Sequence, residues 1–239
     1  MYNFYKSFVG LKRILSTQPS EKKIIFYSES QDYRSYFMEL IINLKRNTSC
    51  KIYYVTSDEK DIDLIDGDLK PIYIGEGFFR TIFFTILNCD IIIMTLTNLG
   101  IHHLKKSKKC KNYIYIFHAI VSTHKCHEKE AFKNYDTIFT VAQYQKEELL
   151  KAEEIYNFPK KKIYNTGYFY FENIVKNIKL DNLDSNNVLF APTWIRSKKN
   201  LFEDYSLLII QLLLDSGYSV TLRTHPETFK RSKKALKKN

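Results

Sequence analysis

Short apolar runs alternate with longer amphipathic stretches along most of this chain, and this alternation constrains its fold more than any other feature. The runs are rich in Ile, Tyr, Phe and Val, as buried strands are. We predict strands at Lys23–Ser28, Lys51–Thr56, Pro71–Ile74, Asp90–Met94, Asn112–Phe117, Asp136–Val141 and Lys162–Asn165. We predict helices at about Asp32–Arg46, Gly77–Leu87, Lys125–Asn134 and Gln143–Tyr156. Strands and helices in this order predict an α/β fold with a mostly parallel sheet covered on both faces.

The first residues of the chain predict a further, amphipathic helix. Phe4, Phe8, Leu11 and Leu15 fall on one side of it, and basic side chains fall elsewhere. Such a helix either lies on a membrane or packs against its own domain, and we favour packing.

Residues 179–187 are polar and rich in turn-forming side chains, which is typical of a linker between domains. This predicts an N-terminal domain over residues 1–178 and a second domain over residues 187–239. The second domain contains a strand, a helix at about Leu201–Ser216 with Gly217 as its C-cap, another strand and a short basic helix. Two strands are few for such a sheet, so we expect the chain to hold only the first part of this domain.

Composition excludes a disordered chain, because 44% of the residues are hydrophobic and 15% are aromatic. The formal net charge is +11, and two basic clusters account for it. They are Lys105, Lys106, Lys108, Lys109 and Lys111, and then Lys230, Arg231, Lys233, Lys234, Lys237 and Lys238. Such clusters attract phosphates, anionic lipids or nucleic acid, or they are the solvated faces of a loop and a terminal helix.

The four cysteines, Cys50, Cys89, Cys110 and Cys126, show no paired spacing. No signal peptide is recognisable, and the apolar runs are far shorter than the roughly 18 residues of a membrane-spanning helix. These features favour a reducing cytoplasm, with cysteines buried as small hydrophobic residues.

Three motifs follow predicted strands at their carboxyl ends, where open α/β sheets bind ligands. They are Phe117-His118-Ala119, Ala191-Pro192-Thr193-Trp194 and Arg223-Thr224-His225-Pro226. A neutral imidazole at His118 accepts a proton from an attacking hydroxyl in one interpretation, and is a hydrogen-bonded structural histidine in the other. Arg223 and His225 are placed to face an anionic group together.

The second motif favours phosphate binding as well, because Thr193 and Arg196 lie at a predicted helix start. A zinc site is not predicted, since the spacing of His124, Cys126 and His127 does not match paired zinc ligands. No glycine pattern of a phosphate loop or a dinucleotide fold is present, and we predict no cofactor.

These motifs resemble those of the CDP-glycerol glycerophosphotransferase family, the polymerases and primases of teichoic-acid-like polymers. Ala191–Trp194 and Arg223–Pro226 carry the resemblance, in the family's order and at about its spacing. Upstream, Phe117–Ala119 stands at the place of the family's Trp-His-Gly, and Ile163–Gly167 lies where the family closes its first domain with a strand and a glycine. The likeness covers about residues 20–228 and is strongest after residue 187.

The resemblance implies a GT-B-like architecture, with a Rossmann-like acceptor-side domain and the first half of a second, nucleotide-side domain. It implies a transferase that moves glycerol phosphate, or a similar polyol phosphate, from a CDP-linked donor to a lipid-linked polyol-phosphate or glycan acceptor. His118 would take the place of the base, and His225 with Arg223 would stabilise the transferred phosphate, with CMP as the leaving group. The side chains implied in substrate binding are Arg223, Thr193, Trp194 and Arg196. No metal or other cofactor is implied.

The chain departs from the family pattern at several positions. Phe117 replaces Trp, Ala119 replaces Gly, and Ile195 intrudes before Arg196, where the family has Arg directly after Trp. The family's Ser-rich nucleotide-binding segment has no counterpart here. We therefore also consider that this chain is a truncated copy of such an enzyme, with little activity.

The resemblance also implies a location: cytoplasmic and peripheral, at the inner face of the cell membrane. The expected partners are the donor, the lipid-linked acceptor and an anionic membrane surface, with no nucleic acid. Two other functions fit the same residues. One is a GT-B glycosyltransferase that uses a nucleotide sugar, and the other is a non-catalytic basic module that binds an anionic membrane or polymer.

Overall fold

The computed structural model describes residues 2–64, 69, 71–101, 104–178, 186–192 and 201–225. The chain forms two units, Met1–Asn177 and Ile178–Asn239, and each is considered by itself. Thr193, Trp194 and Arg196 lie outside the described residues, as does the second basic cluster.

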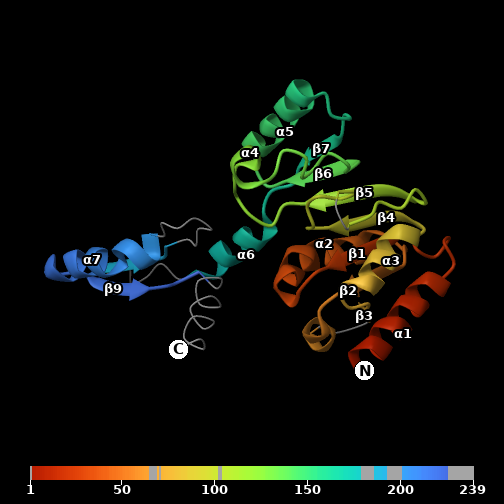
Figure 1. The fold of residues 1–239 in the computed structure, drawn as a ribbon, viewed down its shortest axis with the longest axis horizontal. Helices are drawn as coiled ribbons and strands as arrows, with labels where there is room; N and C mark the ends of the chain where they lie inside the picture. Colours follow the sequence, from red (N-terminus) through yellow and green to blue (C-terminus); the bar gives the residue numbers. More distant parts are fainter. Residues whose placement is uncertain are drawn as a thin grey trace. The chain divides into compact units, whose positions relative to one another are not determined.

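The first unit contains a seven-stranded parallel sheet (Figure 1). Its strands are β1 (Ile24–Ser28), β2 (Ile52–Thr56), β3 (Ile72–Tyr73), β4 (Cys89–Met94), β5 (Cys110–Ile116), β6 (Thr137–Thr140) and β7 (Lys162–Asn165). Their order across the sheet is β3-β2-β1-β4-β5-β6-β7, so the chain moves outward from β1 on one side and then on the other. This is the Rossmann-like order, with its topological switch point between β1 and β4.

Helices cover both faces of this sheet, as the sequence predicts. They are α1 (Tyr2–Ser16), α2 (Arg34–Asn47), α3 (Phe78–Ile86), α4 (Thr123–Cys126), α5 (Gln143–Tyr156) and α6 (Phe169–Asn177), with short 3-10 helices η1 (Gln31–Tyr33) and η2 (Glu59–Leu64). All five residues of β1 are buried. Ile25 and Tyr27 belong to the core beneath α1 and α3, whereas Ile24 and Phe26 belong to the core beneath α2. Burial on both faces explains why β1 reads as a continuous apolar run.

Helix α1 packs against its own domain, and of the predicted side Leu11 and Leu15 contact the core, whereas Phe4 and Phe8 stay exposed. Leu11 and Ile14 are buried, whereas Phe4 is 65% and Phe8 is 50% exposed. Gly10 decides which face packs, because a Cβ atom there would lie 1.8 Å from the backbone oxygen of Tyr73. The helix therefore approaches β3 through its glycine and leaves the two phenylalanines on the outside.

The predicted helix at Lys125–Asn134 is wrong. Helix α4 ends at Cys126, and the residues up to 134 form turns. Successive amide-to-carbonyl bonds span three residues here, as from Ala131 to Glu128 (3.0 Å) and from Lys133 to Glu130 (3.0 Å). Buried apolar side chains in this segment imitate a helical period without a continuous helix. Helix α6 was not predicted.

The second unit contains β8 (Asn187–Phe190), α7 (Leu201–Asp215) and β9 (Ser219–Leu222). The two strands pair in parallel, and Phe190 lies opposite Leu222. Gly217 ends the helix with a positive φ of 83°, as its predicted C-cap role requires. This strand–helix–strand unit holds a two-stranded parallel sheet among the described residues. The predicted α/β class is confirmed, with a Rossmann-like domain followed by a smaller α/β unit, as in a GT-B-like fragment.

Candidate active site

The parallel strands bring several polar side chains to one edge of the first unit's sheet. β5 ends at Ile116, and His118 follows at the carboxyl end of that strand, as predicted. Phe117 is buried at 1% exposure, and its amide donates a hydrogen bond to the carbonyl of Phe139 on β6 (3.2 Å). His118 therefore leaves the sheet from a fixed point beside β6.

The imidazole of His118 lies in an aromatic environment. Its ring centroid is 5.1 Å from that of Tyr33 and 5.8 Å from that of Tyr36. Its Nδ1 atom is buried and has no hydrogen-bond partner among the described residues. Burial, with a smaller contribution from His127, lowers the pKa of His118 to about 4. The side chain is therefore a neutral imidazole at neutral pH, with one ring nitrogen not engaged.

Two side chains hold the backbone around His118. Gln145 on α5 is fully buried, and its Nε2 atom donates to the carbonyls of Ala119 (3.1 Å) and Val121 (3.0 Å). The hydroxyl of Tyr168 donates to the carbonyl of His118 itself (2.7 Å). Sequence reasoning missed both, because a local pattern does not show which polar side chain of a helix or loop faces the strand ends.

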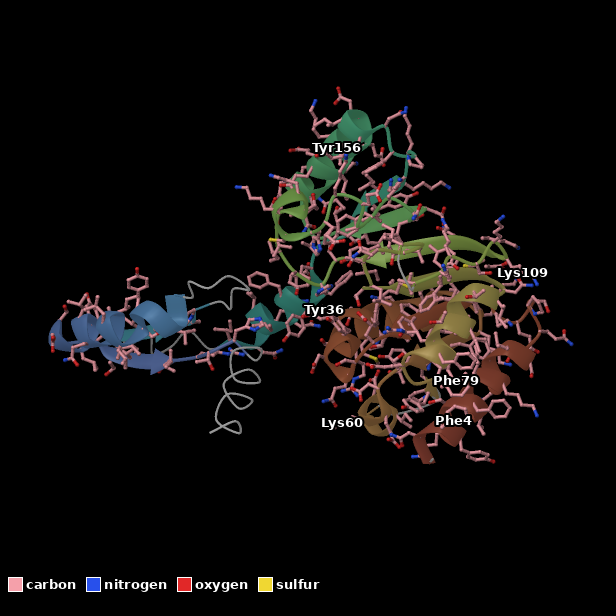
Figure 2. The ribbon with its side chains drawn as sticks, in the orientation of Figure 1. Phe4, Tyr36, Lys60, Phe79, Lys109 and Tyr156 are labelled. Atoms are coloured by element: carbon pink, nitrogen blue, oxygen red, sulfur yellow. The ribbon has the colours of Figure 1, made fainter. Side chains whose placement is uncertain are left out.

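An apolar cavity of about 380 Å³ lies next to His118. It is lined by Tyr36, Leu40, Ile116, Phe117, Phe139, Thr166, Gly167, Tyr168, Phe169 and Tyr170. Tyr36, labelled on α2 in Figure 2, has its ring centroid 6.0 Å from that of Tyr168 and 5.1 Å from that of Tyr170. The candidate base thus adjoins a space that suits an apolar or ring-shaped ligand group.

A more polar cavity of about 430 Å³ borders the residues that follow β4. It is lined by Gly77, Arg80, Thr81, Leu96, Thr97, Asn98, Ile101 and Leu104. A guanidinium nitrogen of Arg80 lies 3.7 Å from a carboxylate oxygen of Glu29, which directly follows β1. Burial raises the pKa of Glu29, and the charge of Arg80 opposes that shift. Sequence reasoning missed this carboxylate, although an acid placed directly after a buried strand was the available signal.

The phosphate-side residues of the prediction lie in the second unit. Arg223 follows β9, and its amide donates to the carbonyl of Phe190 (2.9 Å). Because Phe190 and Leu222 lie opposite each other, the motifs beginning at Ala191 and Arg223 leave the same edge of the two-stranded sheet. His225 is half-buried. Its role in binding the transferred phosphate stays a prediction.

The described residues also cover the histidines that were considered for zinc. His124 Nδ1 lies 3.3 Å from an oxygen of Glu148, and the ring of His127 packs against that of Phe132 (5.0 Å between centroids). Within the described ranges, no group of three or more His, Cys, Asp or Glu side chains could hold a metal ion.

Within the same ranges, no helix has both the length and the apolar character needed to cross a bilayer.

The chain is similar in structure to the wall teichoic acid polymerase TagF, in two structures of a variant soaked with CDPG. The first, soaked for 30 minutes, is 15% identical with a TM-score of 0.47 over 95% of this chain. The second, soaked for 15 minutes, is 16% identical with a TM-score of 0.48 over 94% of this chain. The match spans 65% of the length of each polymerase chain. No protein-family model and no curated protein sequence matches the chain.

Proposed function

We propose that the protein is a transferase of the glycerophosphotransferase type. It moves glycerol phosphate, or a similar polyol phosphate, from a CDP-linked donor to a lipid-linked acceptor in cell-wall or capsule polymer synthesis. The observation that carries this proposal is His118, a neutral imidazole at a strand end with an unengaged nitrogen and an apolar cavity beside it. The motif residues Arg223 and His225 would supply the charge for the transferred phosphate.

His118 would act as the general base on the acceptor hydroxyl. A pKa of about 4 keeps the imidazole unprotonated but makes it a weak base in the free protein. A donor phosphate brought near the ring would raise this pKa, because a negative charge favours the imidazolium. Base strength would therefore rise only when the donor is bound. The proton would leave with the departing CMP or with solvent.

The phosphate would be held by cations rather than by a metal. Arg223 would contact the transferred phosphate, and His225 would donate to it as negative charge moves toward the leaving group. Thr193, Trp194 and Arg196 are proposed to bind the nucleotide side of the donor.

The test is release of CMP from CDP-glycerol in the presence of a lipid-linked acceptor analogue. His118→Ala should lower turnover by about 10²–10⁴-fold and leave the donor affinity nearly unchanged. His225→Ala should lower turnover and also weaken donor binding, measured by calorimetry. His124→Ala is the matched control, because this side chain is 65% exposed and lies nearby in the chain, in α4.

Three outcomes would contradict the proposal. Near-full turnover of His118→Ala would make His118 a structural histidine. Release of a nucleoside diphosphate from a nucleotide sugar, with no reaction of CDP-glycerol, would favour the glycosyltransferase. No release from any donor by the unchanged chain would favour the non-catalytic module.

A membrane location is the second part of the proposal. The outer face of α1 exposes Phe4, Tyr5, Phe8 and Val9 next to the exposed cations Lys12 and Arg13. Phe4, labelled in Figure 2, also packs against Phe79 on α3 (4.8 Å between ring centroids). Aromatic side chains beside cations suit the interface of an anionic bilayer.

The first basic cluster contributes less than its sequence suggests. The ammonium group of Lys106 pairs with Asp136 (2.9 Å) and that of Lys111 pairs with Asp90 (2.6 Å). The remaining side chains of the cluster are exposed. We expect binding to anionic vesicles, weakened by salt and by Phe4→Ser/Phe8→Ser but not by Leu150→Ser on α5. Equal binding to neutral vesicles, or binding to neither, would contradict a charge-assisted membrane contact.

A further inference from the structure

Cys89 and Cys110 are close neighbours in the sheet, although they are far apart in the sequence. Each is the first residue of its strand, and the two are paired partners in the register of β4 and β5. Their Sγ atoms lie 3.3 Å apart. Cys89 is 1% and Cys110 is 7% exposed, whereas Cys50 and Cys126 are exposed.

The backbone places these two sulfurs at a distance that a disulfide can span. Neighbouring strands are about 4.8 Å apart, inside the range of about 4.4–6.8 Å between the Cα atoms of bridged cysteines. Paired residues of adjacent parallel strands point to the same face of the sheet, so both sulfurs enter the same core. Only side-chain rotation is needed to bring the sulfurs to bonding distance.

The surroundings also make the two sulfurs unequal. The hydrogen bond that Cys89 donates lowers the pKa of Cys110, while the same bond and burial raise the pKa of Cys89. The positive charge of the buried Lys22 opposes the rise in the pKa of Cys89 but does not cancel it. One sulfur of the pair is therefore the better nucleophile, and the other is held beside it to resolve an oxidised product.

We propose that Cys89 and Cys110 form a dithiol site that a peroxide oxidises to an intramolecular disulfide and that a small thiol reduces again. The Cys110 thiolate attacks one peroxide oxygen, giving a sulfenic acid, and the second oxygen leaves as water with the thiol proton. The Cys89 sulfur then attacks the sulfenic sulfur, and the displaced hydroxide takes the Cys89 proton to form a second water. The two thiols together lose two electrons and two protons, and hydrogen peroxide is reduced to two water molecules.

The bond would close the whole crossover between β4 and β5. This segment includes Leu96, Asn98 and Leu104, which line the polar cavity, as well as all of the first basic cluster except Lys111. The cysteines lie at the amino ends of their strands, next to Lys109, whereas Tyr36 lies beside His118 at the carboxyl ends (Figure 2). Oxidation would thus constrain the crossover without touching the candidate base, so this inference does not depend on the proposed reaction.

The experiment uses the full chain with Cys50→Ser/Cys126→Ser, which keeps only the buried pair. The reduced protein is treated with hydrogen peroxide, unfolded and alkylated with iodoacetamide, and its mass is measured by mass spectrometry. We expect the loss of two hydrogen atoms, no alkylation, and a peptide that links Cys89 to Cys110. Dithiothreitol should restore two alkylated thiols. The oxidised form should melt about 5–10 °C higher than the reduced form, because the crosslink restricts the unfolded chain.

The control variants are Cys89→Ser and Cys110→Ser in the otherwise unchanged chain, which should form no internal link after the same treatment. Two alkylated thiols in the peroxide-treated Cys50→Ser/Cys126→Ser protein would overturn the proposal. Sulfinic acid on Cys110 without a link, or a disulfide only between two chains, would overturn it as well.

Discussion

The two units of this chain follow the same local pattern of strand, helix and strand, but they differ in how much apolar surface they bury. In the first unit, Phe83, Tyr113 and Tyr115 are fully buried in the core between a seven-stranded sheet and its helices. In the second, Leu207 is 86%, Leu208 59% and Leu189 60% exposed. The local pattern of apolar and polar residues is therefore enough to specify helices and strands. The stability of the fold comes from helices packed on both faces of a sheet.

The same difference separates the two halves of the proposed chemistry. The candidate base is held by a buried glutamine, a tyrosine hydroxyl and an apolar wall. Arg223 follows a strand whose residues are largely exposed and has an exposed side chain. We infer that the acceptor side is organised before substrates arrive and that the phosphate side becomes organised when the donor binds.

Limited proteolysis tests this comparison most strongly. Bonds in the described part of the second unit should be cut at least about a hundredfold faster than bonds in the first, because local opening costs less where few apolar side chains are buried. A resistant fragment near residues 1–177 should accumulate, identified by mass spectrometry. Equal protection of residues 186–225 would show that the second unit is as stable as the first.

Alanine substitution of apolar side chains should have a much larger effect on stability in the first unit than in the second. Phe83→Ala removes a fully buried ring and should lower the free energy of unfolding by about 3–5 kcal/mol. Leu207→Ala, at 86% exposure, should change it by less than about 0.5 kcal/mol. Urea denaturation followed by circular dichroism measures both. A loss above 2 kcal/mol for Leu207→Ala, by the same scale, would mean that this leucine is buried in solution.

The strands and most helices of both units could be predicted from the sequence, because the hydrophobic periodicity that indicates them is a local property of the chain. The face of α1 could be predicted only in part, because Gly10 contacts the backbone of β3, a segment far away in the sequence. The cysteine pair could not be predicted, because the predicted strands began at Asp90 and Asn112 and the register between two strands is a tertiary property. His118 could be placed at a strand end, but its low pKa comes from burial against Tyr33 and Tyr36, which no motif encodes.

The pH dependence of stability should distinguish the histidines of the two units. Burial lowers the folded-state pKa of His118 to about 4, so between about pH 6.5 and 4 the unfolded chain binds a proton that the folded chain does not. Stability should therefore fall as the pH falls through this window. His118→Gln should reduce the loss between pH 7 and pH 4.5 by about 2 kcal/mol. His225→Gln should leave the decrease in the unfolding free energy of the first unit between pH 7 and pH 4.5 unchanged. Urea denaturation at each pH measures both variants.

Two glycines with positive φ provide the smallest and most local test. Gly77 (φ 65°) precedes α3 and Gly217 (φ 83°) follows α7, and a Cβ atom at either position would meet no neighbouring atom. An alanine therefore costs only backbone strain, about 1–2 kcal/mol at each position.

Gly77→Ala should lower the unfolding free energy of the first unit by that amount. Gly217→Ala should leave it unchanged and alter only the transition seen in the fluorescence of Trp194, the single tryptophan, which belongs to the second unit. If both variants shift the circular dichroism and fluorescence transitions together, the two units unfold as one, and the contrast between them holds for packing but not for stability.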